Sequence, residues 1–240
     1  VGRDALAVVV GTENDFATDV TIEELALIFS TAETWADVRS DWPAEPILRY
    51  IPGTDSGTFD YFVEEVFDEE EEPILAANNL ELSEDDNVLV QGVTGSPYAV
   101  SFFGYAYYSE NADALTPLSI DGVAPERENV DNNTYPLARP LFIYSDGTIM
   151  AEKPQVADYI NFFLTFVNEE VVDVGYFPAS DAALQNARDG WMMGMGMMDM
   201  SMDEEMMDDD MMGMMLPEID IFSVGGDVVT AGSSTVFPLA

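Results

Sequence analysis

The sequence predicts an α/β fold, in which strands and helices alternate along the chain. Apolar runs typical of strands, such as residues 4–10 and 139–145, alternate with segments of helical spacing such as 21–30 and 153–167. The 240 residues are 48% hydrophobic and 11% aromatic, so the chain carries enough apolar side chains for a large core. Both observations favour layered helices and strands over an all-helical or disordered chain.

The first elements lead directly to a Gly-rich loop. The run DALAVVV (4–10) is continuously apolar, which predicts a strand buried on both faces. A helix is expected over 21–30, because Thr21 and Glu24 have the spacing of a capping box. A strand over 45–51 then enters the stretch IPGTDSGTFDYF, after which the sequence predicts a helix over 58–67.

The later segments continue the alternation. They are a helix over 83–93, a strand and helix start or a buried aromatic hairpin over 98–108, a strand over 139–145, a helix over 153–167 with Pro154 in its first turn, and a last helix over 180–190 ending at Gly190.

Charge and composition exclude several classes of function. The chain has 47 acidic and seven basic residues, a formal net charge of −40, which argues against nucleic acid or anionic lipid as a partner. It contains no Cys and no His, which excludes disulfides, thiolate chemistry and a Ser-His-Asp triad. No metal site and no cofactor are predicted. The acidic surface suits a salty or extracellular setting.

The step Ser56-Gly57-Thr58 has the chemistry of an anion site. Gly57 lets backbone approach a ligand closely, the N–H groups of a helix start lack intrahelical partners, and the hydroxyls of Ser56 and Thr58 can donate to oxyanion oxygens. An ordinary helix cap without a ligand explains the same residues. Asp55 either caps the turn or accepts a hydrogen bond from a protonated oxygen of phosphate.

A Met-rich segment follows the predicted α/β region. Residues 192–215 hold all but one of the 14 Met, together with acids and Gly, without a regular period. Thioethers are soft ligands that suit Cu(I). The low-complexity composition favours a linker instead.

The order of motifs resembles the PstS-type phosphate-binding proteins, the solute receptors of ABC phosphate importers. Eight segments carry the resemblance in family order: VGRDALAVVV, LALIFS with the following Trp, YIPGTDSGTFDYF, DDNVLVQGV through SPYAVSFFGYAYY, IDGVAP, TYPLARPLFIYS, KPQVADYINFFL and GYFP. Together they cover roughly residues 1–190.

The resemblance implies a two-lobed fold of the periplasmic-binding-protein type II kind, incomplete here because most of the N-terminal part of lobe one is absent. Residues 1–130 would form lobe two and 131–190 would return to lobe one, so that 1–190 make the C-terminal two-thirds of a module. It further implies inorganic phosphate as ligand, an ABC permease as partner, and a periplasmic or extracellular location, with room for a membrane anchor in a missing N-terminal segment.

The end of the chain resembles the start of a second module. Residues 191–216 would be the linker, and 217–240 the first strand and loop of the next module, with Ser233, Ser234, Thr235 and Val236 matching the family's first phosphate loop. A circular permutation is the alternative explanation.

For the site, the resemblance implies that Ser56, Gly57 and Thr58 bind phosphate. The family places an arginine a few residues before this step, where Pro52 stands here; Arg49 lies further back and is expected to face outward. Arg139, in the motif LARPLFIY, is a supporting candidate or a structural ion pair, and Asp55 is a further supporting candidate. Rival hypotheses are a receptor for another oxyanion, a surface scaffold protein, and a phosphoester hydrolase.

Overall fold

A computed structural model describes residues 1–197, 215–219 and 224–230. These residues form two compact units. One comprises Asp4–Arg139, and the other comprises Val1–Arg3 together with the described residues from Pro140 onward. The predicted second-module loop, Ser233 to Val236, lies outside the described residues, as does most of the Met-rich segment.

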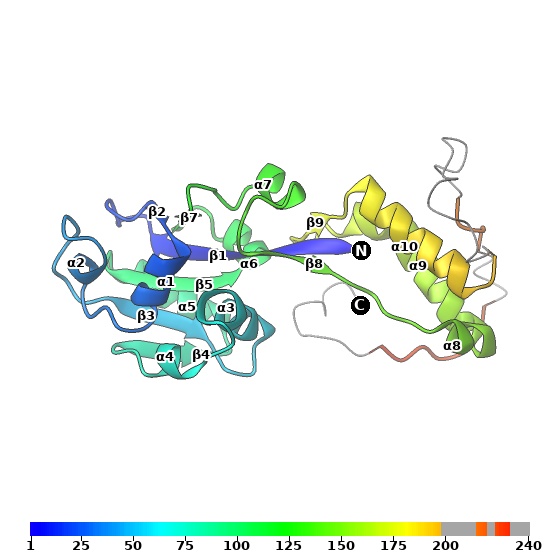
Figure 1. Ribbon diagram of the computed structural model, residues 1–240, viewed down its shortest axis with the longest axis horizontal. Coiled ribbons are helices and arrows are strands. Elements are labelled where there is room, and N and C mark those ends of the chain that lie inside the picture. Colours follow the sequence, from blue (N-terminus) through cyan, green and yellow to red (C-terminus); the bar gives the residue numbers. More distant parts are fainter. Residues whose placement is uncertain (198–214, 220–223, 231–240) are drawn as a thin grey trace. The chain divides into compact units, whose positions relative to one another are not determined.

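The larger unit is built on a mixed sheet with the strand order β4-β3-β5-β1-β6 (Figure 1). Strand β3 is parallel to β4 and β5, whereas β1 is antiparallel to β5 and β6. A short parallel pair, β2 with β7, lies apart from this sheet. The strands of the unit are β1 (Gly2–Gly11), β2 (Asp19–Val20), β3 (Leu48–Pro52), β4 (Leu80–Ser83), β5 (Ala99–Gly104), β6 (Leu115–Pro117) and β7 (Ser119–Ile120).

Strand β1 confirms the expectation of a strand buried on both faces. Its residues from Asp4 to Gly11 are all buried, because helices cover the sheet from both sides. On one face, Phe62 stacks on Phe102 of β5 with ring centroids 3.9 Å apart, and Phe29 packs edge-on against both rings. On the other face, Leu89 and Val93 join the cluster around Phe103 and Val9.

The helices of this unit are α1 (Ile22–Ile28), α2 (Trp35–Val38), α3 (Gly57–Phe67), α4 (Glu72–Leu75), α5 (Asp86–Thr94), α6 (Tyr105–Glu110) and α7 (Arg127–Asp131). Two of them, α1 and α3, begin next to the caps predicted at Thr21 and Ser56, whereas the helix expected from 83 begins at Asp86 because Asp85 is its N-cap. The segment 98–108 is therefore a strand followed by a helix, β5 and α6, and not a hairpin.

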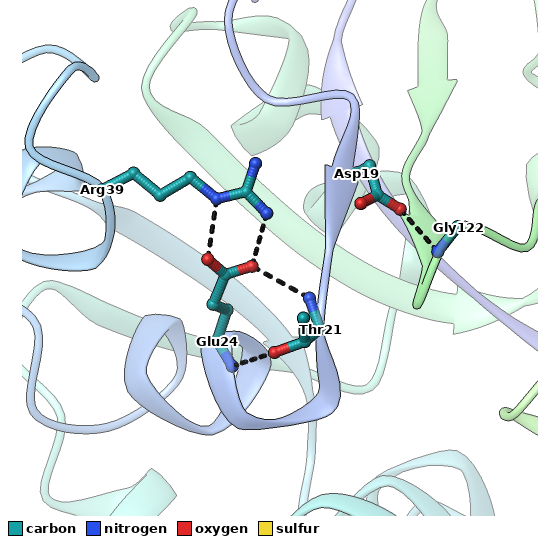
Figure 2. Close-up of polar contacts among 5 residues, drawn as sticks. All are labelled: Asp19, Thr21, Glu24, Arg39 and Gly122. Atoms are coloured by element: carbon teal, nitrogen blue, oxygen red, sulfur yellow. Dashed lines mark hydrogen bonds and ion pairs between the residues drawn. The ribbon is translucent and has the colours of Figure 1, made fainter.

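The predicted capping box of α1 is present and is extended by an arginine (Figure 2). The Thr21 hydroxyl accepts from the Glu24 N–H, and the Glu24 carboxylate accepts from the Thr21 N–H. Arg39 donates to both oxygens of this carboxylate, over 2.7 and 2.6 Å. Nearby, the carboxylate of Asp19 accepts from the Gly122 N–H at 2.8 Å, which ties β2 to the turn after β7.

The smaller unit consists mainly of three helices that pack on one another, α8 (Gly147–Glu152), α9 (Pro154–Glu170) and α10 (Asp181–Gly194) (Figure 1). Strand β9 (Phe177–Pro178) pairs with the first residues of β1. Helix α9 begins at Pro154 as predicted.

Two predicted boundaries in this part of the chain are wrong. The last helix continues through Gly190 to Gly194, because Trp191 and Met192 are buried and the Trp191 indole donates to the Ala157 carbonyl at 3.0 Å. The strand expected over 139–145 is β8 (Ala138–Leu141), which stops at Leu141. Beyond it, the apolar side chains of Phe142 and Tyr144 are exposed.

Candidate functional site: the first turn of helix α3

The Ser56-Gly57-Thr58 step forms the start of α3, directly after strand β3. The backbone turns at Gly53, whose carbonyl accepts from the Ser56 N–H at 3.0 Å. Ser56 is the N-cap in an extended conformation, and its hydroxyl oxygen accepts from the Thr58 N–H at 3.2 Å. The predicted helix start is thus confirmed, and only the terminal N–H groups of a first turn remain available to an outside acceptor.

The exposure of this turn suits a ligand site. Ser56, Gly57 and Thr58 are all partly exposed, whereas Phe59 in the same turn is buried and anchors the helix to the core. The hydroxyl proton of Ser56 is not used by the cap, since the oxygen acts as acceptor there, so it can still be donated. Asp55 is exposed at the preceding turn.

Arg139, the last residue of the segment Asp4–Arg139, lies against this turn. Its guanidinium donates to the Gly57 carbonyl at 3.2 Å and to the Asp4 carboxylate at 3.1 and 3.3 Å, and it lies 4.5 Å from the centre of the Tyr61 ring. Of the two alternatives for Arg139, a supporting site residue or a structural ion pair, the structure shows the ion pair, with Asp4 as its partner.

The electrostatics of this cluster are set by burial. Asp4 is 5% exposed, and loss of water raises the pKa of its carboxyl, while the Arg139 guanidinium opposes that rise. Burial also raises the pKa of the Tyr61 hydroxyl, which therefore stays neutral. The Asp4–Arg139 pair is formally neutral, so the positive end of α3 is not cancelled by an excess of negative charge within the cluster.

Asp4 and Tyr61 were not predicted as part of this cluster. One signal was available for Asp4, because a single acid at the start of an otherwise apolar buried strand requires a cationic or hydrogen-bonding partner. Tyr61 follows Gly57 by one helical turn, but its spacing alone does not reveal an arginine on its ring.

Arg49 is placed differently from the expectation. It does not face outward: it is completely buried in β3, and its guanidinium donates to the backbone carbonyls of Ile28, Ala32 and Asn78. Its role is to join the end of α1 to the sheet, since these carbonyls belong to chain segments on either side of β3. It does not contribute to the turn at Gly57.

The described part of the chain gives no further ligand set. Within residues 1–197, 215–219 and 224–230, no group of three or more His, Cys, Asp or Glu side chains is arranged to hold a metal ion. Over the same residues, none of the helices has the length and apolar character needed to cross a bilayer.

Comparison with known proteins places this fold in a family. A model of the PBP superfamily domain matches residues 1–166, which include β1, the α3 turn and Arg139. The chain belongs to the PBP superfamily. The predicted α/β fold class is confirmed by a superposing solved structure, and the predicted resemblance to PstS-type proteins is confirmed by the similarity to relatives named PstS.

Two curated proteins similar to this superfamily member, one of them named for phosphate binding, show the extent of the match. The chain is 38% identical to protein SphX of Synechocystis over 195 residues, covering 76% of this chain and 56% of the relative. It is 32% identical to the phosphate-binding protein PstS of Staphylococcus aureus over 195 residues, covering 79% and 58% of the two chains. The chain thus spans less than two thirds of the length of these curated relatives.

Solved structures show the same fold. A possible phosphate binding protein from Planctomyces limnophilus superposes with a TM-score of 0.70 at 34% identity, covering 81% of this chain and 71% of that one. A phosphate transport receptor of the ABC type from Vibrio cholerae superposes with a TM-score of 0.61 at 21% identity, covering 73% and 70%. The second likeness concerns the fold alone.

Proposed function

We propose that the chain is part of an extracytoplasmic solute-binding protein that captures inorganic phosphate at the first turn of α3 and delivers it to the permease of an ABC importer. The observation that carries this proposal is the partly exposed Ser56-Gly57-Thr58 step, which caps a helix within a family match that includes relatives named for phosphate binding. No covalent chemistry is part of the proposal.

Phosphate would be held by local donors and not by net charge. Hydrogen bonds between neutral donors and a charged oxyanion each contribute about 1.5–3 kcal/mol, and a helix N-terminus adds roughly 0.3–2 kcal/mol. Distant surface acids are screened over about 8 Å at physiological salt. Several hydrogen bonds from Ser56, Gly57 and Thr58 can therefore outweigh the repulsion between phosphate and a chain of net charge −40.

The remaining assignments follow from the same proposal. Residues 1–190 would be the C-terminal two-thirds of one receptor module, with 1–130 in lobe two and 131–190 returning to lobe one. Residues 191–216 would link it to a second module begun by 217–240, whose Ser233, Ser234, Thr235 and Val236 would serve another phosphate site. Asp55 and Arg139 would support the site at Ser56.

Calorimetric titration of the full-length protein with inorganic phosphate, and separately with sulfate, tests this function. Thr58→Val keeps the shape of the side chain but removes a donor, so phosphate affinity should fall about tenfold. The matched control is Thr94→Val on α5, whose hydroxyl donates only to backbone carbonyls of its own helix and should be neutral for binding.

Two outcomes would contradict the proposal. A folded protein that gives no heat with phosphate would favour a scaffold role. Equal affinity for sulfate would instead indicate a general oxyanion receptor.

A further inference from the structure

Arg139 connects its own strand, β8, to two elements of the larger unit that are remote in sequence, β1 and α3. Its side chain, 22% exposed, reaches Asp4 on β1, the Gly57 carbonyl at the start of α3 and the Tyr61 ring one turn later. Asp4 is the residue at which the chain enters this unit, and Arg139 is the residue at which it leaves. The guanidinium therefore ties the first turn of α3 to both ends of the unit.

The contact with Gly57 acts on backbone and not on a ligand position. Gly57 is the first residue of α3, and its carbonyl belongs to the peptide whose N–H is that of Thr58. A peptide is planar, so a donor fixed on the carbonyl also fixes the direction of that N–H, which donates to the Ser56 hydroxyl oxygen at 3.2 Å and so holds the N-cap of the turn in place. Since Gly has few conformational restraints of its own, an external contact at this peptide has a larger effect than it would at another residue.

The shape of the guanidinium matches this arrangement. Two nitrogens, Nε and Nη2, face one oxygen of Asp4, while Nη1 faces Gly57 and the flat face covers Tyr61. A lysine ammonium carries the same charge but has no planar fork to satisfy these directions together. The buried Asp4 carboxylate, 7% exposed in its side chain, in turn holds the fork in place.

We propose that Arg139 is a positioning residue for the anion site: it orients the Gly57–Thr58 peptide through the Gly57 carbonyl and links occupancy of that turn to the strands β1 and β8. This inference rests on the proposed function, because it concerns the same turn of α3. It assigns Arg139 an indirect role, with no contact to the ligand.

The experiment uses the full-length protein, inorganic phosphate as probe, and two readouts. Calorimetry gives the affinity, and hydrogen–deuterium exchange measures how far saturating phosphate protects the amides of residues 2–6 and 137–141. In the wild-type protein, phosphate should slow exchange in both strands. Arg139→Met should weaken phosphate binding at least about tenfold and abolish this added protection even at saturation.

Two further variants test whether the effect of Arg139→Met comes from the shape of the guanidinium, from its charge or from a failure to fold. Arg139→Lys retains the charge and should still lose most of the affinity and the protection, since the fork is missing. Tyr61→Leu leaves the ion pair and removes only the stacked ring, so it should weaken phosphate binding about threefold. This variant takes the place of Arg139→Met if Arg139→Met does not fold. The control is Arg127→Met, which removes an exposed ion pair with Asp131 and should change neither readout.

The outcomes distinguish the proposed function from the positioning role of Arg139. No phosphate binding by the wild-type protein overturns both the proposed function and this inference. Wild-type binding with an Arg139→Met affinity within about twofold, full rescue by Arg139→Lys, or unchanged exchange in both strands on phosphate addition overturns the positioning role alone.

Discussion

Arg49 is expected to be the most stabilising basic residue of the larger unit. It is completely buried, and its guanidinium donates to the buried carbonyls of Ile28 and Ala32 and to the carbonyl of Asn78. In the described part of the chain it takes part in no ion pair, and burial lowers its pKa to about 10. Hydrogen bonds to these backbone carbonyls therefore replace the hydrogen bonds to water that the guanidinium loses on burial.

The substitution Arg49→Met keeps most of the side-chain volume and removes the donors. Each buried carbonyl left without a partner costs about 1–3 kcal/mol, so the carbonyls of Ile28 and Ala32 together cost about 2–6 kcal/mol. Met carries no charge, so the variant avoids the cost of burying the guanidinium, which offsets part of this loss. We expect a net loss of about 3 kcal/mol in the free energy of unfolding, a large part of the roughly 5–15 kcal/mol typical of a native protein.

Urea unfolding followed by tryptophan fluorescence measures this loss, because Trp35 and Trp42 are buried in the same unit. The midpoint should fall while the slope with urea stays constant. Arg127→Met is the control, since its exposed ion pair should contribute no more than about 0.5 kcal/mol. A loss below about 1 kcal/mol for Arg49→Met would show that the carbonyls of Ile28 and Ala32 do not depend on its guanidinium.

Two further predictions concern pH and salt. The hydrogen bonds from Arg39 lower the pKa of Glu24 below its usual 4.5, so the charged carboxylate stabilises the fold above that pH and this contribution is lost as the pH falls through the lowered pKa. Glu24→Gln should therefore cost about 1 kcal/mol at neutral pH and nothing in strong acid, as measured by urea unfolding; a difference independent of pH would contradict this. Because the net charge is −40, raising salt from physiological levels to about 1 M, where screening shortens from roughly 8 to 3 Å, should raise the free energy of unfolding and leave phosphate affinity unchanged or slightly higher. A steep loss of phosphate affinity with salt, in calorimetry, would indicate a basic site elsewhere in the protein.

Local signals in the sequence predicted much of the fold. The capping box of Thr21 and Glu24, the continuous apolar run of β1 and the cap at Ser56 each lie within a few residues, and each is found in the structure. These features depend on contacts that one segment makes with itself, or on burial that its composition already requires. The start of the candidate site was predictable for the same reason.

The contacts that were not predicted join segments remote in sequence. Arg49 stands in a strand-like run where an outward side chain is equally compatible with the pattern, and the carbonyls it satisfies belong to other segments. Arg139 and Asp4 are 135 residues apart, so their pairing and the contact with Gly57 follow from topology alone. Helix α10 passes Gly190 because Trp191 finds a buried position against α9, which outweighs the local preference of glycine for a helix end.

A comparison of two helix caps tests directly whether phosphate binds at the first turn of α3. Ser56 and Ser180 are both N-cap residues whose hydroxyl oxygens accept from their own helices, α3 and α10. Aspartate is as good a cap as serine, so Ser56→Asp should leave the free energy of unfolding within about 0.5 kcal/mol. It also places a negative charge where phosphate would be bound and removes a donor, so phosphate affinity should fall at least about 100-fold.

The measurement is calorimetric titration of both variants of the full-length protein with phosphate. We expect Ser180→Asp to bind phosphate as the wild-type protein does, while Ser56→Asp, equally well folded, does not bind it measurably. Phosphate binding by Ser56→Asp at wild-type affinity would contradict the assignment of the anion site to the first turn of α3.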